Sequence, residues 1–326
     1  MAGVPVILGV DGGNSKTELV VATLEGEPVA YVRGPGSNSH TEGPARTAAF
    51  LSGLAARAEL PAPVVQGTFY LCGADIPADF AALAKALEQE PWVERAAVDN
   101  DIFALLRAGT DAVDAVAVVC GAGINCAGRS SDGRVARYPS LGWETGDWGG
   151  SVMFGREVLF LSARGEDGRG EPTGLADVLR EHFDLPLDEL GEAVRYGRIV
   201  PGRLGEVAPA VVDAAAAGDA VARQLVDRLA EEIVLMATRA LTELGLARRP
   251  ASVLLGGGML RDGRGLLYEE TLARLAERAP RATATPVTAA PVLGAALDAL
   301  DAAGAPPAAA ARLRAAFETE VPVSSL

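Results

Sequence analysis

Lysine, cysteine and aromatic residues are scarce in this chain of 326 residues. The three cysteines, Cys72, Cys120 and Cys126, show neither the paired spacing of a zinc site nor a disulfide framework, which favours a reducing cytoplasm. Aromatic residues make up 5% of the chain although 49% of it is hydrophobic, so we expect a core of Ala, Val and Leu. No uncharged apolar run has spanning length and no signal-peptide pattern opens the chain, so we expect no membrane insertion.

Positive charge is scarce as well. The chain has 29 basic and 43 acidic residues, and its net charge is −14 at pH 7. This charge repels nucleic acids and anionic membranes, which we therefore exclude as partners. The length is sufficient for two domains with full cores, and no linker long enough to separate independent modules interrupts the sequence.

The N-terminal part predicts a β-hairpin with a glycine-rich turn. Apolar runs at 4–10 and 19–24 flank the segment Asp11-Gly12-Gly13-Asn14-Ser15-Lys16-Thr17, and a third run follows at 29–32. Adjacent glycines let the backbone approach another molecule, and the N–H groups, two hydroxyls and lysine of this turn suit a polyphosphate. Asp11 ends the first strand, where a carboxylate can hold Mg²⁺ through water. An ordinary hairpin turn also explains the glycines, but one of the chain's two lysines stands here, which favours a phosphate ligand.

A second glycine turn repeats this pattern. An apolar strand at 115–119 leads into Gly121-Ala122-Gly123, and an acidic turn, Asp132-Gly133, precedes a third strand, as Glu25-Gly26 does in the N-terminal part. The two glycine turns are therefore nearly as far apart in the sequence as the two acidic turns, which indicates two copies of one fold unit. Two such glycine turns facing each other would bind one phosphate chain from both sides.

Two further places carry polar groups beside predicted strands. Asn38 and His40 lie in the turn-rich loop 34–40, where we expect a solvated His40 and leave Asn38 open between a ligand-binding and a loop role. Asp101 follows the strand at 95–98 and opens a helix at 102–108. Open α/β sheets place their chemistry at such strand ends, although Asn100 or Asp101 would also serve as the helix N-cap.

The second half adds two glycine-rich segments. The loop 142–151 contains Trp143, Asp147 and Trp148, which predict one wall of a sugar or nucleotide site, with core packing as an equal alternative for each tryptophan. Residues 173–245 are predicted to be mostly helical, with an apolar core stripe. A strand at 252–255 then runs into three glycines, which let a flat ligand approach the backbone.

Four stretches together resemble the motifs of a known superfamily. They are DGGNSKT (11–17), GAGINC (121–126), GWETGDWGG (142–150) and LLGGGML (254–260). In this order they resemble the actin-like ATPase superfamily of sugar kinases and heat-shock ATPases. Within it the chain is similar to the N-acetylglucosamine kinase and BadF/BadG-type ATPase family, from Val6 to about Leu297.

The resemblance implies a fold and a reaction. The fold is α/β, with two ribonuclease-H-like lobes, residues 1–113 with 291–326 and residues 114–290, and ATP in the cleft between them. The helix after Pro291 would pack back on the first lobe. The reaction is transfer of the γ-phosphoryl group of ATP to the 6-hydroxyl of N-acetylglucosamine or a close relative. The resemblance also implies Mg²⁺, a cytoplasmic enzyme, and allows a homodimer.

It further implies a role for individual residues. Asp101 would be the catalytic base, and Mg²⁺ would lie near Asp11. The sugar would contact Asn38, Gly73, Gly123, Asn125, Gly146 and Asp147. The ATP phosphates would contact Gly12, Gly13, Asn14, Ser15, Lys16, Thr17, Gly121 and Gly123, and the adenosine would contact Gly256, Gly257 and Gly258.

The sequence departs from the family pattern at one place. Many members read Gly-Asp-Glu-Gly-Ser where this chain reads Gly146-Asp147-Trp148-Gly149-Gly150-Ser151, so the bulky Trp148 leaves the accepted sugar open. Glucosamine and N-acetylmuramate are alternatives to N-acetylglucosamine. A non-catalytic regulatory ATP-binding protein is the alternative from another class. The cysteine-rich zinc loop of the other common bacterial sugar-kinase family is missing, and the position of Cys120 and Cys126 beside the second glycine turn disfavours an iron–sulfur activator.

Overall fold

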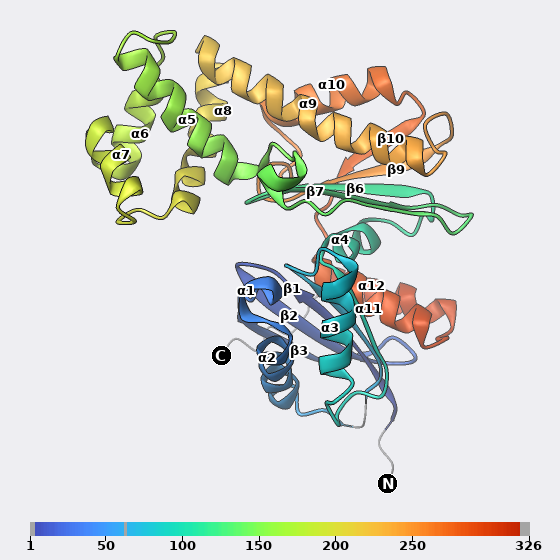
Figure 1. Ribbon diagram of the computed structural model, residues 1–326. Coiled ribbons are helices and arrows are strands. Elements are labelled where there is room, and N and C mark those ends of the chain that lie inside the picture. Colours follow the sequence, from blue (N-terminus) through green and yellow to red (C-terminus); the bar gives the residue numbers. More distant parts are fainter. Residues whose placement is uncertain (1–3, 62–63, 320–326) are drawn as a thin grey trace. The chain divides into compact units, whose positions relative to one another are not determined.

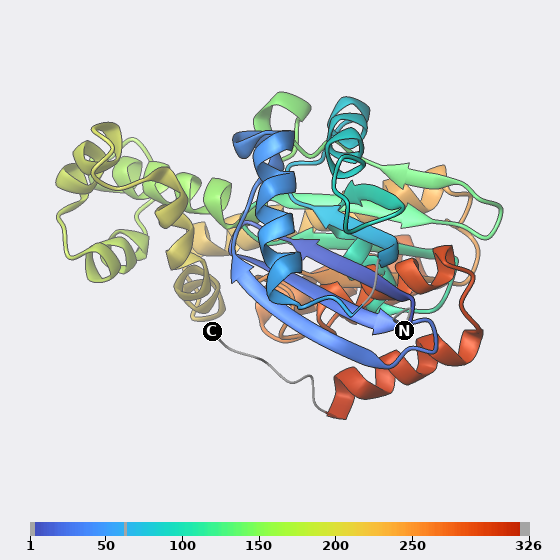
Figure 2. The same ribbon diagram turned by 90° about the horizontal axis from the view of Figure 1, so that it is seen from below.

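The computed structural model describes residues 4–61 and 64–319 (Figures 1 and 2). The chain divides into two compact units. The first unit comprises Met1–Asp111 and Ala289–Leu326, and the second comprises Ala112–Thr288. Each unit is built on one five-stranded mixed sheet, so the predicted α/β fold with two lobes is confirmed.

The sheet of the first unit has the strand order β3-β2-β1-β4-β5. Strands β1 (Val6–Gly12), β2 (Lys16–Thr23) and β3 (Pro28–Pro35) form an antiparallel meander, and β4 (Val64–Leu71) and β5 (Ala96–Asn100) continue it in parallel. Every residue of β1 is buried, because helices cover both faces. Leu8 and Val10 pack under α2 (Pro44–Arg57) and α3 (Pro77–Leu87), while Ile7 packs under α11 (Pro291–Ala302) and α12 (Pro307–Thr319) (Figure 1).

The sheet of the second unit has the order β10-β9-β6-β7-β8. Here β6 (Ala115–Cys120), β7 (Ile124–Arg129) and β8 (Val135–Arg137) form the meander, and β9 (Ala251–Gly256) and β10 (Ala282–Pro286) are the parallel strands. Read from its other edge, this is the order of the first sheet. The two copies of one fold unit that the recurring turns predict are therefore present.

The second unit differs by a helical insertion between β8 and β9. It contains a 3-10 helix (Gly142–Thr145), α5 (Gly150–Glu166), α6 (Leu175–Phe183), α7 (Leu187–Arg195), a second 3-10 helix (Pro201–Val207), α8 (Ala208–Ala216) and α9 (Ala220–Glu243). The apolar stripe of α9 is buried in the core of this unit, as predicted. The last helix of the unit is α10 (Leu266–Arg278). Of the helices that the structure describes, none is both long and apolar enough to cross a membrane.

Several element boundaries differ from the sequence prediction. Strands β1 and β2 extend into the glycine segment, because their ladder continues as far as the Gly12–Thr17 pair. A short helix, α1 (Ser39–Glu42), follows the predicted loop. Helix α3 begins at Pro77, before Asp79, whose carboxylate accepts hydrogen bonds from the backbone N–H groups of Asp75 and Ile76 at 3.1 Å.

Two glycines bring α11 against the first sheet. A Cβ atom on Gly9 of β1 would lie 2.3 Å from the backbone nitrogen of Ala296. A Cβ atom on Gly294 would lie 2.0 Å from the carbonyl oxygen of Ala104 in α4 (Ile102–Gly109). These contacts are backbone to backbone, so no larger side chain fits without displacing α11. They fix α4, whose first turn follows Asp101, relative to β1, which carries Asp11.

Candidate active site

The first glycine turn (residues 12–17) joins two paired strands. Asp11 on β1 lies directly opposite Glu18 on β2, and their side chains therefore share one face of the sheet. The chain reverses at Gly13, Asn14 and Ser15, where the N–H of Gly13 donates to the carbonyl of Lys16 at 2.9 Å. Asn14 and Ser15 are exposed at the tip. The sequence analysis placed the end of β1 one residue too early and did not single out Glu18, whose partner only the strand register reveals.

Glu18 is a buried carboxylate with two donors. Its Oε2 lies 2.5 Å from Lys16 Nζ, and its Oε1 accepts a hydrogen bond from the hydroxyl of Tyr31 at 2.5 Å. Only 3% of Glu18 is exposed, whereas the Lys16 side chain is 36% exposed. An ammonium has three donors, so Lys16 keeps donors for a ligand while Glu18 orients it.

The Thr17 hydroxyl does not reach the surface. Thr17 is fully buried, and its Oγ1 has no hydrogen-bond partner among the residues that the structure describes. Of the two hydroxyls in the turn, only that of Ser15 is therefore exposed. The sequence analysis expected two accessible hydroxyls in this turn, and the structure offers only one among the described residues. Alternation along β2 directs the Thr17 side chain away from the face that carries Lys16 and Glu18.

Asp11 and Asp101 are two interacting carboxyls with raised pKa values. Burial raises the pKa of Asp11 to about 8, and the charges of Asp101 and Glu18 add to the rise while Lys16 opposes it. Burial raises the pKa of Asp101 to about 6, and Asp75 adds to that rise. A carboxyl with a pKa near 6 is ionised at neutral pH and still basic enough to accept a proton, which is the property of a general base.

Asp101 occupies the N-cap position of α4 without a side-chain capping hydrogen bond, and Asn100, the residue before it, supplies one instead. Asn100 Oδ1 accepts a hydrogen bond from the N–H of Ile102 at 3.1 Å. Its Nδ2 donates to the carbonyl of Ala74 at 3.0 Å and to Asp75 Oδ1 at 2.8 Å. These bonds tie the start of α4 to the end of β4, so they hold Asp101 at the carboxyl edge of the sheet.

Asn38 links α1 to the first glycine turn. Its Oδ1 caps α1 by accepting from the N–H groups of His40 (3.1 Å) and Thr41 (3.3 Å), and its Nδ2 donates to Asn14 Oδ1 at 3.0 Å. A Cβ atom on Gly73 would lie 2.5 Å from Asn38 Oδ1, so a glycine at this position leaves room for the Asn38 amide. His40 is exposed, as expected.

Cys72 shows that these groups lie in one neighbourhood. Its Sγ accepts a weak hydrogen bond from Asn38 Nδ2 at 3.5 Å. Burial raises the pKa of the Cys72 thiol to about 12, and the charges of Asp101, Asp75 and Asp11 contribute. The first unit therefore brings Asp11, Asn38 and Asp101 together around the ends of β1 and β4, and Cys72 stays a protonated thiol among them.

The second glycine turn (residues 121–123) is held by the start of α5. The N–H groups of Ser151 and Val152 donate to the carbonyls of Gly121 (2.7 Å) and Ala122 (3.1 Å). Gly150 has a φ of +74°, and a Cβ atom on it would lie 2.3 Å from Gly123 Cα. The carbonyls of Gly121 and Ala122 are thus bonded to the start of α5. Ala122 and Gly123 are exposed at the tip of the turn. Cys120 and Cys126, on either side, are buried in the core.

Asn125 and Asp147 are held in different ways. Asn125 Oδ1 accepts from the hydroxyl of Ser140 and from the N–H of Cys126, both at 2.7 Å. Asp147 is half-buried, its carboxylate accepts a hydrogen bond from the hydroxyl of Thr145, and its N–H donates to the carbonyl of Gly142 at 2.9 Å. Asp147 therefore lies in a closed loop, which we call the tryptophan loop (residues 142–149).

The two tryptophans of this loop have opposite surroundings. Trp143 is 81% exposed, whereas Trp148 is 6% exposed and belongs to the core of the second unit. The hypothesis of two tryptophans forming one ligand wall is therefore wrong for Trp148. The alternative of core packing holds for Trp148, and which sugar is accepted stays open.

The third glycine segment lies beside a pocket of the second unit. Gly257 has a φ of +86°, and a Cβ atom on it would lie 2.4 Å from the carbonyl oxygen of Cys120. A pocket of about 490 Å³ opens next to Gly258 and Met259, between α8 and the start of α10. Its walls include Pro209, Val212 and Leu267. The charged residues Asp213, Asp262 and Arg264 line it as well. A pocket of this size, with both apolar and polar walls beside exposed backbone, suits a flat heterocycle.

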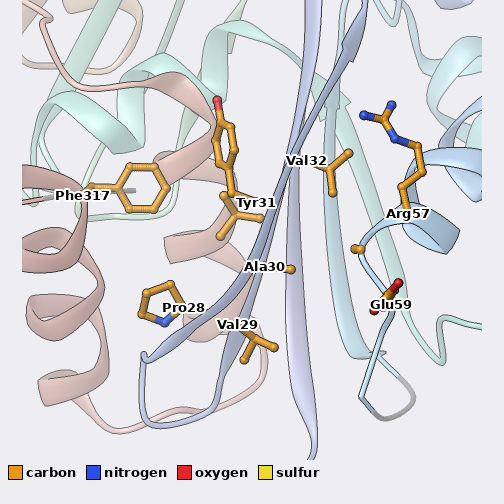
Figure 3. Close-up of a pocket in the computed structure, with 10 residues that line it drawn as sticks. Pro28, Val29, Ala30, Tyr31, Val32, Arg57, Glu59 and Phe317 are labelled. Carbon is orange, nitrogen blue, oxygen red and sulfur yellow. The ribbon is translucent and has the colours of Figure 1, made fainter. Parts of the chain in front are cut away.

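A second pocket lies on the first unit, away from the predicted residues. It has a volume of about 300 Å³ and follows the edge strand β3, with Tyr31 and Phe317 on one side of the strand and Arg57 and Glu59 on the other (Figure 3). Its lining contains none of the residues that the sequence analysis assigned to a ligand. Its lining is mostly apolar, and Glu59 is the one carboxyl among its lining residues, so it contains no carboxyl pair like Asp11 and Asp101.

Comparison with known proteins places the chain in a family. The family model of the BadF/BadG/BcrA/BcrD ATPases matches residues 8–299. The chain is 24% identical to an N-acetylmuramic acid/N-acetylglucosamine kinase of Clostridium acetobutylicum, over 81% of this chain and 88% of that protein. It is 25% identical to an N-acetyl-D-glucosamine kinase of Dictyostelium discoideum, over 91% and 98%.

Solved structures share the fold. A candidate N-acetylglucosamine kinase of Chromobacterium violaceum superposes with a TM-score of 0.70 at 22% identity, covering 90% of this chain and 98% of that one. A ROK family glucokinase of Streptomyces griseus, solved with glucose and AMPPNP, superposes with a TM-score of 0.56 at 16% identity, covering 90% and 98%. The family match spans most of the sequence and includes all four glycine-rich segments, and the chain therefore belongs to the BadF/BadG/BcrA/BcrD ATPase family.

Proposed function

We propose that the protein is an ATP-dependent aminosugar kinase that transfers the γ-phosphoryl group to the 6-hydroxyl of N-acetylglucosamine or a close relative. The observation that carries the proposal is the Asp101 carboxyl, with a pKa raised to about 6, at the carboxyl end of β5 and near Asp11. A family of ATPases and relatives named as aminosugar kinases support the same reaction.

In this reaction Asp101 accepts the proton of the sugar hydroxyl as the oxygen attacks the γ-phosphorus. Phosphoryl transfer depends mainly on positioning and on stabilising the charge that develops on the phosphoryl oxygens. Lys16, oriented by Glu18, supplies a positive charge at the first glycine turn. We assign the phosphates to the two glycine turns, with Gly12, Gly13, Asn14 and Ser15 in the first and Gly121 and Gly123 in the second. The N–H groups of Gly13 and Gly121 bond within their own turns, to the carbonyls of Lys16 and Gly123 at 2.9 Å. The backbone donors that we propose for the phosphates are therefore those of the exposed residues Asn14, Ser15 and Gly123.

The Asp11 carboxyl fits a magnesium ion. It offers a hard oxygen ligand, and the described residues hold no group of three or more acidic, His or Cys side chains that would form a complete cage. Magnesium in phosphoryl-transfer enzymes is held by one or two carboxylates together with the substrate phosphates, which matches this donor set. When bound, the ion supplies positive charge to the phosphates.

We assign the sugar to Asn38, Gly73, Gly123, Asn125, Gly146 and Asp147, and the adenosine to Gly256, Gly257 and Gly258. The half-buried carboxylate of Asp147 supports a role in accepting sugar hydroxyls. The exposed indole of Trp143 offers a face for the apolar side of a sugar ring. The pocket beside Gly258 and Met259 supports the adenosine assignment.

The experiment that tests this function is an ADP-release assay of the purified protein with Mg²⁺ and ATP. The panel of acceptors contains N-acetylglucosamine, N-acetylmuramate, glucosamine, N-acetylmannosamine and glucose. We expect N-acetylglucosamine or N-acetylmuramate to give the highest kcat/KM. If no acceptor in the panel stimulates ADP release, the protein is not a sugar kinase, and the alternative of a regulatory ATP-binding protein replaces it.

Two further properties stay proposals. The three cysteines are free thiols, which supports a reducing compartment such as the cytoplasm. We also propose a homodimer, and analytical ultracentrifugation of the full chain would test it by measuring the mass of the particle in solution.

A further inference from the structure

The tryptophan loop has one apolar anchor. Leu141, Trp143, Glu144, Thr145 and Gly146 are exposed, and Trp148 is the first side chain of the segment that reaches the core. Of the described residues 141–149, Trp148 alone is a large buried side chain. The position of Asp147, its immediate neighbour, therefore depends on how firmly Trp148 is held.

Arg228 covers the indole of Trp148 from α9. The Cζ atom of its guanidinium lies 3.9 Å from the ring centroid, which is the distance of a stacked cation–π pair. Trp148 is thus held between the core of the second unit on one side and a guanidinium on the other.

The same arginine lies among the carboxyls around the loop. Glu232, one helical turn after Arg228, is half-buried, and burial raises its pKa. The charge of Asp147 adds to this rise and the charge of Arg228 opposes it, so the three side chains share one neighbourhood. Without the cation, Asp147 and Glu232 would face each other as two carboxyls that repel when both are ionised.

We propose that Arg228 is a positioning residue for the sugar: by stacking on Trp148 it fixes the tryptophan loop and thereby the carboxylate of Asp147. This inference rests on the proposed function in that Asp147 binds the sugar. It gives a role to Trp148, the residue at which the sequence departs from its family pattern. Arg228 itself is exposed.

Steady-state kinetics with the best acceptor test the inference. Arg228→Ala should raise the KM for the sugar by about 3- to 30-fold, the range that a cation–π pair corresponds to, and leave the KM for ATP within twofold. Arg228→Lys keeps the charge but lacks the planar face, so we expect an intermediate sugar KM. Arg239→Ala is the matched control, because Arg239 is an exposed arginine of the same helix whose contact is a 3.7 Å ion pair with Glu243.

A double variant separates positioning from general destabilisation. If Arg228 acts through Asp147, Arg228→Ala should raise the sugar KM by less than twofold in an Asp147→Ala background. The same rise in both backgrounds, a parallel rise in the KM for ATP, or no change in the sugar KM would each overturn the inference.

A measurement without substrate keeps the inference independent of the kinase activity. The N–H groups of Gly146 and Asp147 bond to the carbonyls of Trp143 (3.2 Å) and Gly142 (2.9 Å) within the loop. Hydrogen exchange at these two amides should become at least threefold faster in Arg228→Ala and stay unchanged in Arg239→Ala. Unchanged exchange would refute the positioning role, whereas faster exchange in a chain that phosphorylates no sugar would refute only the proposed function.

Discussion

Replacing Asp11 by asparagine should stabilise the protein at alkaline pH. The carboxyl is 8% exposed, and burial together with Asp101 and Glu18 raises its pKa from 3.8 to about 8. The folded chain therefore holds this proton more tightly than the unfolded chain does. As the pH rises from about 4 to about 8, the unfolded chain loses the proton first, and stability falls over this window. Asparagine has nearly the same shape and never ionises, so the variant avoids this loss.

The size of the effect follows from the pKa. A tenfold difference in proton affinity between the folded and unfolded chains corresponds to about 1.4 kcal/mol, so the raised pKa of Asp11 sets an upper bound of about 6 kcal/mol. We expect about a third of this bound, ~2 kcal/mol at pH 8, because side chains and water relax around a buried charge. For a protein of this size, each kcal/mol moves the melting temperature by about 1.5 °C. Asp11→Asn should therefore melt about 3 °C above the wild type at pH 8.

Thermal melts at pH 5 and pH 8, without nucleotide or divalent cation, check this prediction. At pH 5 the wild type keeps most of the proton, so the difference should shrink to below about 1 °C. Glu88→Gln is the control, because Glu88 is an exposed carboxylate of the same unit. The reasoning is refuted if Asp11→Asn melts below the wild type at pH 8, or if its advantage grows as the pH falls.

Three further predictions concern activity. Asp101→Asn should lower kcat by about 10²–10⁴-fold and retain ATP binding, and near-normal turnover in this variant with loss in Asp99→Asn would shift the assignment of the base by two residues. In the wild type, kcat/KM should fall as the pH drops below about 6, because the raised pKa of Asp101 protonates the base there, and a profile that is flat between pH 5 and 7 would contradict this. Lys16→Ala should reduce kcat/KM more than it reduces the melting temperature, since Lys16 lies beside the hairpin tip and Tyr31 still donates a hydrogen bond to Glu18 in the variant; an unchanged rate with a large drop in melting temperature would make Lys16 structural.

The sequence alone predicted the repeat, and its resemblance to a known family predicted the fold class. In each half an apolar strand leads through a glycine turn into a second strand, and an acidic turn leads into a third, which is the local chemistry of an antiparallel meander. Because such signals are local, they can be recognised in the sequence without knowledge of the tertiary structure. The same holds for the helical stripe of α9, whose apolar residues recur with the helix period and are buried as predicted.

The carboxyl pair could be anticipated only in part. The sequence placed Asp11 and Asp101 at strand ends, where ligands bind in open α/β sheets. It did not indicate Glu18 as the partner of Lys16, because that pairing depends on the register between β1 and β2. Nor did it reveal that Asp101 occupies the N-cap position of α4 while the side chain of Asn100 accepts the hydrogen bond from the N–H of Ile102, since both residue types cap helices equally well.

The tertiary structure alone decided what each tryptophan of the loop does. Trp143 and Trp148 are identical in type and five residues apart in a glycine-rich segment, so composition and spacing describe them alike. One is exposed and the other is stacked between a core and the guanidinium of Arg228, which lies far away in sequence on α9. Local propensity fixes the strands, turns and helices of this chain. Which side chain is buried depends on contacts between distant segments, and these exist only once the elements have packed.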